Sequence, residues 1–155
     1  MSAMKSVFLA IDMATQARDQ AGKALSRIER SFTAAQSQLD QLEHYAADTE
    51  SRWSVTTQTQ TTTELMRHHY QFLERLHQAI NLQQGVLSDL SMQVVESRNT
   101  LLQAEFRLTG LKKVLKRQQQ ELDRQSSQRE QKQMDELAAA QHMRSDKQHY
   151  AGGQS

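Results

Sequence analysis

The sequence predicts an all-α protein, a long two-helix antiparallel coiled-coil hairpin whose second helix continues past the first as a single-helix overhang. Three observations support this fold class. The 155 residues contain no proline and only five glycines, so few positions force the backbone to turn. Apolar residues recur in both halves of the chain at alternating steps of three and four. A threonine-rich segment separates the two halves.

The first helix is expected from about residue 4 to residue 52. Its apolar positions alternate in steps of three and four over six heptads, which is the pattern of a coiled-coil seam because a helix wound to 3.5 residues per turn keeps one narrow face toward a partner. The seam positions are Met4, Val7, Ile11, Ala14, Arg18, Ala21, Leu25, Ile28, Phe32, Ala35, Leu39, Leu42, Ala46 and Thr49.

A turn is expected at about residues 53–61. Six of the eight residues from Thr56 to Thr63 are threonine, and β-branched threonine weakens a helix because it loses rotamer freedom there. Thr61 followed three residues later by Glu64 fits a capping box at a helix start. The second helix is therefore expected to begin near Thr62.

The second helix is expected from about residue 62 to residue 145, and it carries a second seam. A turn between two seams lets them pack against each other antiparallel within one chain. If the turn centres near Gln58, Met4 lies opposite Lys112. The seam positions are Leu73, Leu76, Ile80, Gln83, Leu87, Leu90, Val94, Ser97, Leu101, Ala104, Leu108, Leu111, Leu115, Gln118 and Leu122.

The two predicted helices differ in length, at about 70 Å and about 125 Å for a rise of 1.5 Å per residue. The second helix therefore has no internal partner beyond about Lys113. Residues 1–111 carry 10 basic and 12 acidic groups, whereas residues 112–155 carry 9 basic and 6 acidic groups. We expect a single helical domain over residues 1–147 with a basic overhang, and a disordered tail over residues 148–155.

Composition and motifs favour a binding protein over an enzyme. The net charge is +1 and there is no cysteine, which disfavours a general nucleic-acid or membrane affinity and a disulfide framework. The apolar run from Val7 to Ile11 is too short for a signal peptide or a membrane span. No catalytic, metal or cofactor motif is found. Acidic residues such as Glu121 interrupt the C-terminal basic stretch and disfavour a DNA-binding arm.

Two aromatic residues lie one step off the seams. The hairpin register places Tyr45 opposite position 71, next to Phe72, so the two are expected to be neighbours. Two interpretations are open: the aromatic residues thicken the edge of the coiled coil, or they anchor a docking surface. With residues on the same helix faces they form a shoulder of six residues, Gln38, Leu42, Tyr45, Phe72, Leu76 and Ala79.

Three sequence blocks, in this order and at these separations, resemble the FliJ family of flagellar type III export proteins. The blocks are QLDQLEHY from Gln38 to Tyr45, YQFLERLHQAI from Tyr70 to Ile80 and EQKQMDELAAAQHMR from Glu130 to Arg144. The resemblance implies a cytoplasmic, non-catalytic stalk similar to the gamma subunit of rotary ATP synthases, peripheral to the inner-membrane flagellar base and without a cofactor. It covers most of the chain.

The resemblance also implies partners. The ends of the coiled coil would project into the hexameric ring of the export ATPase and promote its assembly, the shoulder would contact the cytoplasmic linker of the membrane export gate, and export chaperones would bind as well. The six shoulder residues match the gate-contact pattern of the family, whereas Thr49 and Gln83 depart from it. Candidate ring contacts are Lys112, Lys113, Lys116, Arg117, Arg124 and Met134.

Two alternative functions are open at this stage. The first alternative is the equivalent stalk of a virulence type III injectisome, which the same fold would suit. A generic coiled-coil scaffold or homodimer with no ATPase partner is the second alternative. The threonine break argues against a continuous parallel dimer, so we expect the free protein to be a monomer.

Overall fold

The structure is a computed structural model that describes residues 2–57 and 62–152. Those residues form two helices, α1 (Ser2–Thr57) and α2 (Thr63–Gly152), of 56 and 90 residues. The chain divides into two compact units, one formed by Ala14–Arg107 and the other by Met1–Met13 with Leu108–Ser155. The prediction of an all-helical hairpin with a longer second helix is confirmed.

The helix ends differ from the expected ones. Helix α1 continues to Thr57 instead of ending near residue 52, because threonine costs at most about 0.7 kcal/mol relative to alanine in a helix and two threonines do not stop it. At the start of α2, the backbone N–H of Leu65 donates to the hydroxyl of Thr62 at 3.3 Å, which makes Thr62 the N-cap. The expected cap, Thr61, lies outside the described residues.

The C-terminal end of α2 also lies beyond its expected position. The helix reaches Gly152, so residues 148–152, which the sequence assigned to a disordered tail, are helical. Residues 153–155 lie outside the described residues. Gln148 and Ala151 are good helix formers, the sequence contains no proline, and no described residue has a positive φ that would end the helix earlier.

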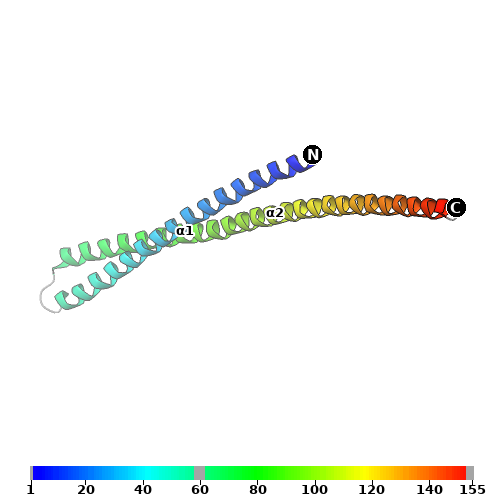
Figure 1. Ribbon diagram of the computed structural model, residues 1–155. Helices are drawn as coiled ribbons and strands as arrows, with labels where there is room; N and C mark the ends of the chain where they lie inside the picture. The colour runs from blue at the N-terminus through cyan, green and yellow to red at the C-terminus, as the bar shows by residue number, and fades with distance from the viewer. Residues whose placement is uncertain (1, 58–61, 153–155) are drawn as a thin grey trace. The chain divides into compact units, whose positions relative to one another are not determined.

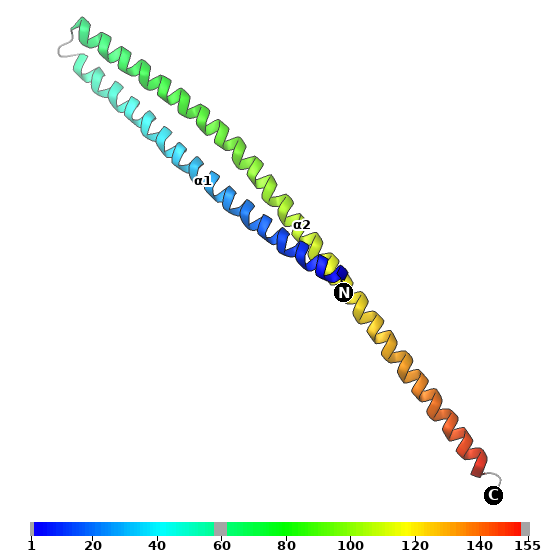
Figure 2. The same cartoon turned by 90° about the horizontal axis from the view of Figure 1, so that it is seen from above.

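Within the unit Ala14–Arg107, α1 and α2 lie side by side and antiparallel (Figures 1 and 2). The core is a narrow seam between them, formed by Ala35, Leu39, Ala46, Leu76, Ile80 and Leu87, with Phe32, Leu42 and Leu90 packed against it. All of these are predicted seam positions. Every predicted seam residue of α1, and every one of α2 from Leu73 to Gln118, is buried or half-buried, whereas Leu122 is exposed.

Polar and aromatic contacts fix the register of this unit. The side-chain amide of Gln83 donates to the backbone carbonyl of Ala35 at 2.9 Å, and Arg98 forms an ion pair with Glu29 at 3.3 Å. Near the connection between the helices, the rings of Trp53 and His69 stack with centroids 4.0 Å apart.

The second unit places the N-terminal turn of α1 against a later part of α2 than expected. Ala3 and Met4 line a small cavity of about 250 Å³ together with Gln118, Glu121 and Leu122. The prediction that Met4 faces Lys112 is therefore wrong. The later end of α1 does not explain this shift, because Tyr45 lies beside Phe72, one residue from its expected position 71, whereas Met4 lies beside residues at least six positions beyond Lys112. Every side chain from Glu121 to Tyr150 is exposed, so the overhang begins about ten residues later than expected.

Candidate partner-binding surfaces

The structure brings Tyr45 and Phe72 together on the outside of the hairpin. Their ring centroids are 5.9 Å apart and the ring planes meet at 81°, an edge-to-face arrangement that adds about 0.5–1.5 kcal/mol beyond the burial of apolar area. Tyr45 is nevertheless 54% exposed and Phe72 41% exposed. The prediction that the two residues are neighbours is confirmed, and both rings keep much of their surface accessible.

The other four shoulder residues lie at different depths. Leu76 belongs to the buried core and Leu42 packs against it, while Ala79 is half-buried. Gln38 is exposed, and its side-chain oxygen accepts a hydrogen bond from Gln83 at 3.1 Å. The shoulder therefore consists of a supporting layer in the seam and an accessible layer formed by Gln38, Tyr45 and Phe72. Contact with a partner through these six residues stays a prediction.

The two positions that depart from the family pattern both lie at the seam. Thr49 and Gln83 are half-buried. The side-chain amide of Gln83 donates hydrogen bonds to the backbone carbonyl of Ala35 and to the side-chain oxygen of Gln38. Neither offers the large accessible side chain with which an aromatic residue or a histidine would extend the shoulder. The accessible surface of the shoulder is therefore centred on the Tyr45 and Phe72 pair.

The candidate ring-contact residues lie on α2, in the unit that contains Leu108–Ser155. All six are exposed. The five basic ones differ in one respect, because Arg124 forms two hydrogen bonds with Glu121, at 2.7 and 3.1 Å. No other basic residue of the set forms an ion pair with a described residue, so their charges are directed to solvent. The set comprises Lys112, Lys113, Lys116, Arg117, Arg124 and Met134.

The pair formed by Glu121 and Arg124 perturbs both ionisable groups. The hydrogen bond from Arg124 holds the pKa of the Glu121 carboxyl below its ordinary value, and the same bond raises the pKa of the Arg124 guanidinium. Hydrogen bonding to a charged form favours that form, so both residues stay ionised over a wider pH range. The positive charge of Arg124 is partly neutralised by its neighbour on the same helix.

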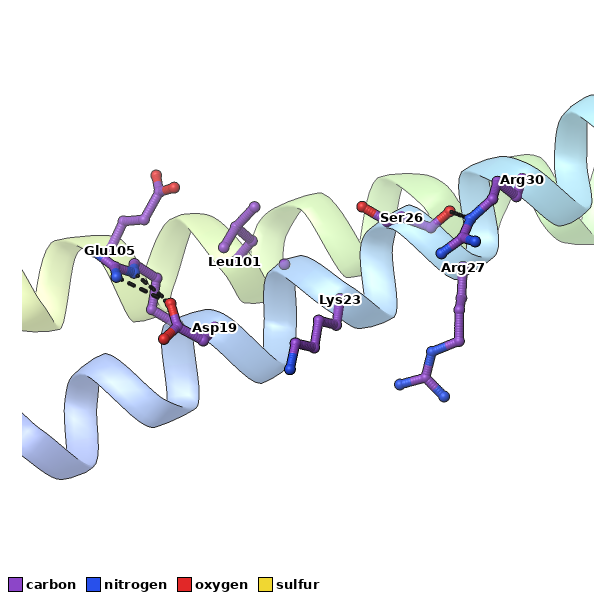
Figure 3. Close-up of a pocket in the computed structure, with 9 residues that line it drawn as sticks. Asp19, Lys23, Ser26, Arg27, Arg30, Leu101 and Glu105 are labelled. Atoms are coloured by element: carbon purple, nitrogen blue, oxygen red, sulfur yellow. Dashed lines mark hydrogen bonds and ion pairs between the residues drawn. The ribbon is translucent and has the colours of Figure 1, made fainter.

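Sequence reasoning missed a basic groove on the hairpin. It has a volume of about 920 Å³ and lies along α1 in the unit Ala14–Arg107, with Leu101 and Glu105 of α2 at its edge (Figure 3). Arg18 pairs with Asp19 at 2.9 Å, whereas Lys23 and Arg27 form no ion pair with a described residue. The signal was present as basic residues at i, i+4 and i+7 (Lys23, Arg27 and Arg30), but a net charge summed over residues 1–111 conceals it.

The described residues contain neither a candidate metal site nor a helix fit to span a membrane. Among those residues, no three His, Cys, Asp or Glu side chains lie close enough to share a metal ion. None of the described helical stretches combines the length and the apolar character that a bilayer crossing requires. The fold defines the class as a coiled-coil hairpin protein with exposed side chains along its helix faces.

Comparison with known proteins places the chain in a family. Residues 6–147 match the model of the family described as the flagellar FliJ protein, and the chain therefore belongs to the FliJ family. No curated protein sequence matches the chain. Among solved structures, it is similar to one described as a YscO homologue from Chlamydia trachomatis, with a TM-score of 0.68 and 13% sequence identity. That similarity covers 92% of this chain and 93% of the chlamydial chain, and it shows a shared fold.

Proposed function

We propose that this protein is a non-catalytic, cytoplasmic stalk of the flagellar type III protein export apparatus. In this role it promotes assembly of the export ATPase ring and links the ring to the membrane export gate. The observation that carries the proposal is the family match over residues 6–147. The accessible aromatic pair on the hairpin and the cationic segment of α2 supply two separate contact surfaces, as a coupling protein requires.

The cationic segment is the proposed contact with the ATPase ring. Lys112, Lys113, Lys116 and Arg117 are exposed, and Met134 adds an apolar side chain that is 68% exposed. Beyond Leu122 every side chain of α2 up to Tyr150 is exposed. A helix that leaves its whole circumference accessible fits inside a ring of surrounding subunits. Association through lysine and arginine would weaken as salt concentration rises.

The shoulder is the proposed contact with the cytoplasmic linker of the export gate. Tyr45 and Phe72 present large accessible rings, and aromatic residues of this kind dominate the binding free energy of protein interfaces. Leu42 and Leu76 of the same shoulder are held in the seam, so the shoulder has a rigid support. A preformed support lowers the entropy lost on binding. Export chaperones are further proposed partners.

The experiment that tests the proposal mixes the purified protein with the export ATPase. We expect a larger hexamer fraction in sedimentation and a higher rate of ATP hydrolysis than with the ATPase alone. A variant carrying Lys112→Glu, Lys113→Glu and Lys116→Glu should lose this stimulation. The matched control carries Lys23→Glu and Arg27→Glu in the basic groove of the hairpin and should keep it. If the protein changes neither quantity, the stalk function fails.

Two alternatives are separated by complementation. In a bacterial strain that is non-motile because its own FliJ-family gene is deleted, the protein should restore swimming. Restoration of injectisome secretion without swimming would assign it to the virulence system. Failure in both assays, together with no ATPase stimulation, would leave a coiled-coil scaffold.

A further inference from the structure

A strip of exposed apolar side chains runs along α2 within the unit Ala14–Arg107 and belongs to neither proposed surface. Its four members are far more accessible than seam residues of the same type. They are Met92, Val95, Leu102 and Phe106, which are 64%, 57%, 48% and 68% exposed, respectively.

The spacing of the strip indicates that a helix would cover it. With Asn99 included, the strip advances in steps of three, four, three and four, which is the alternation of a coiled-coil seam. It copies the buried seam from Val94 to Leu108 at an offset of two residues. Two residues are about 200° around a helix, so most of the strip lies away from α1, with Val95 at the edge of a cavity that Glu29 and Phe32 of α1 also line. Only a further helix matches a repeat of this period.

The charges beside the strip identify the chemistry of that helix. Asp89, Glu96 and Glu105 occupy flanking positions, and none of the three forms an ion pair with a described residue. The one basic flanking residue, Arg98, is engaged with Glu29 at 3.3 Å. The strip is therefore apolar along its centre and acidic along its edges.

We propose that this strip, from Met92 to Phe106, is the docking site for an amphipathic helix of a partner protein that carries an apolar seam flanked by lysine or arginine. Burial of the four apolar side chains supplies affinity, and pairing of the three carboxylates with basic residues selects the partner. Asn99 lies at the centre of the strip, where a polar seam residue fixes the register of a coiled coil.

A second copy of this chain is a poorer occupant of the strip. Pairing two identical strips would bring acidic edges into one interface, and the basic flanking residue Arg98 is already engaged with Glu29. Like charges across an interface suppress a wrong partner. The proposal is independent of the proposed stalk function, since it uses neither the shoulder nor the cationic segment.

The test uses the full chain and a pair of synthetic helical peptides of about three heptads, one heptad more than the strip from Met92 to Phe106 spans. Both peptides have the same leucine seam, and they carry either lysine or glutamate at the flanking positions. Fluorescence anisotropy of the labelled peptides should show saturable binding of the lysine peptide and at least about tenfold weaker binding of the glutamate peptide. Equal affinities, or no saturable binding of the lysine peptide, would overturn the proposal.

Variants assign the binding to the strip. Val95→Asn with Leu102→Asn should weaken binding of the lysine peptide at least about tenfold, which corresponds to 1.4 kcal/mol. The control Leu82→Asn changes an apolar residue that is 74% exposed but lies off the strip, and it should bind as the wild type does. Circular dichroism checks that all variants remain folded, which their exposure predicts.

Charge reversal supplies an independent measurement. Glu96→Lys with Glu105→Lys should reverse the preference, so that the glutamate peptide binds more tightly than the lysine peptide. Sedimentation of the wild type tests whether a second copy of this chain covers the strip. A dimer that dissociates on introduction of Val95→Asn and Leu102→Asn would show that a second copy covers the strip and would overturn the proposal.

Discussion

The side-chain amide of Gln83 on α2 reaches across the seam and donates a 2.9 Å hydrogen bond to the backbone carbonyl of Ala35 on α1. This carbonyl lies inside a helix, so it also accepts from its own helix and uses its second lone pair for Gln83. A polar residue at a seam position thereby becomes a link between the two helices. It fixes their register at a point where two apolar side chains could slide.

Replacement of Gln83 should separate the hydrogen bond from the packing. Gln83→Ala loses both and should lower the free energy of unfolding by about 1 kcal/mol. Gln83→Leu regains apolar burial and should lie within about 0.5 kcal/mol of the wild type. Thermal unfolding followed by circular dichroism measures both values. Gln84→Ala, at an exposed neighbouring position, is the control, and an equal loss there would remove any special role of Gln83.

The seam itself should not tolerate charge. Leu39 is buried and Leu90 packs against the same core, so aspartate at either position places an unpaired charge between the helices. Leu39→Asp and Leu90→Asp should each cost several kcal/mol, seen as a large fall in melting temperature. Gln41→Asp, at an exposed position two residues from Leu39, should change little. Wild-type melting of both leucine variants would mean that the seam is misassigned.

Stability and gate binding should separate at Phe72. Because this ring is 41% exposed and meets Tyr45 in an edge-to-face arrangement, Phe72→Ala should lower the free energy of unfolding by only about 0.5–1.5 kcal/mol. Binding to the purified linker of the export gate should weaken by more than about 1 kcal/mol in calorimetry. Leu82→Ala, which removes an exposed apolar side chain elsewhere on α2, should affect neither. If Phe72→Ala lost stability without losing affinity, the ring would belong to the hairpin edge alone.

Hydrogen exchange should divide α2 into two parts. Residues from about 123 to 150 have exposed side chains throughout, and a helix without packing partners opens readily. Their amides should exchange fast in the free protein, whereas those from Leu73 to Leu101 should be protected. Saturating export ATPase should slow exchange in the first segment. Unchanged exchange there would show that this segment does not enter the ring.

The pair of Glu121 and Arg124 should be visible in a pH titration. The pKa of Glu121 is held below its ordinary value by Arg124. The pair therefore supports the helix above the ordinary titration range of glutamate, and this support is lost as pH falls through the lowered pKa. Arg124→Gln should raise the pKa of Glu121 toward the ordinary value, as measured by NMR of the side-chain carboxyl. Added salt should shrink the difference, because both groups are exposed.

The helical architecture could be predicted because one signal dominates the sequence. Alternating steps of three and four identified the seam residues from Met4 to Thr49 and from Leu73 to Gln118, and all of them are buried or half-buried in the structure. Helix ends were harder to place, since a threonine cluster shifts the helix equilibrium by only a few tenths of a kcal/mol per residue. The segment that faces Met4 was misplaced because one assumed turn position set the register of the whole hairpin, whereas the observed register is close to it at Tyr45 and Phe72 and differs at Met4.

Surfaces were less accessible to sequence reasoning than the seam. Tyr45 and Phe72 could be paired because the register error is small at that point of the hairpin. The strip from Met92 to Phe106 was missed because apolar residues off the seam look scattered until the burial of each is known. The basic groove around Lys23 and Arg27 was missed because charge was summed over long segments, where acidic residues on other helix faces cancel it.

The narrow seam has a consequence for how the protein comes apart. Among the described side chains, none is exposed by less than 2%, and the best-covered ones, Ala14 and Leu108, still show 4% of their surface. Such an interior has no centre on which all other contacts depend. Each layer of the seam touches only the layers above and below it, so stability accumulates along a line and one layer can open while the next stays closed. We therefore expect the two helices to separate locally and to pack again without global unfolding of the protein.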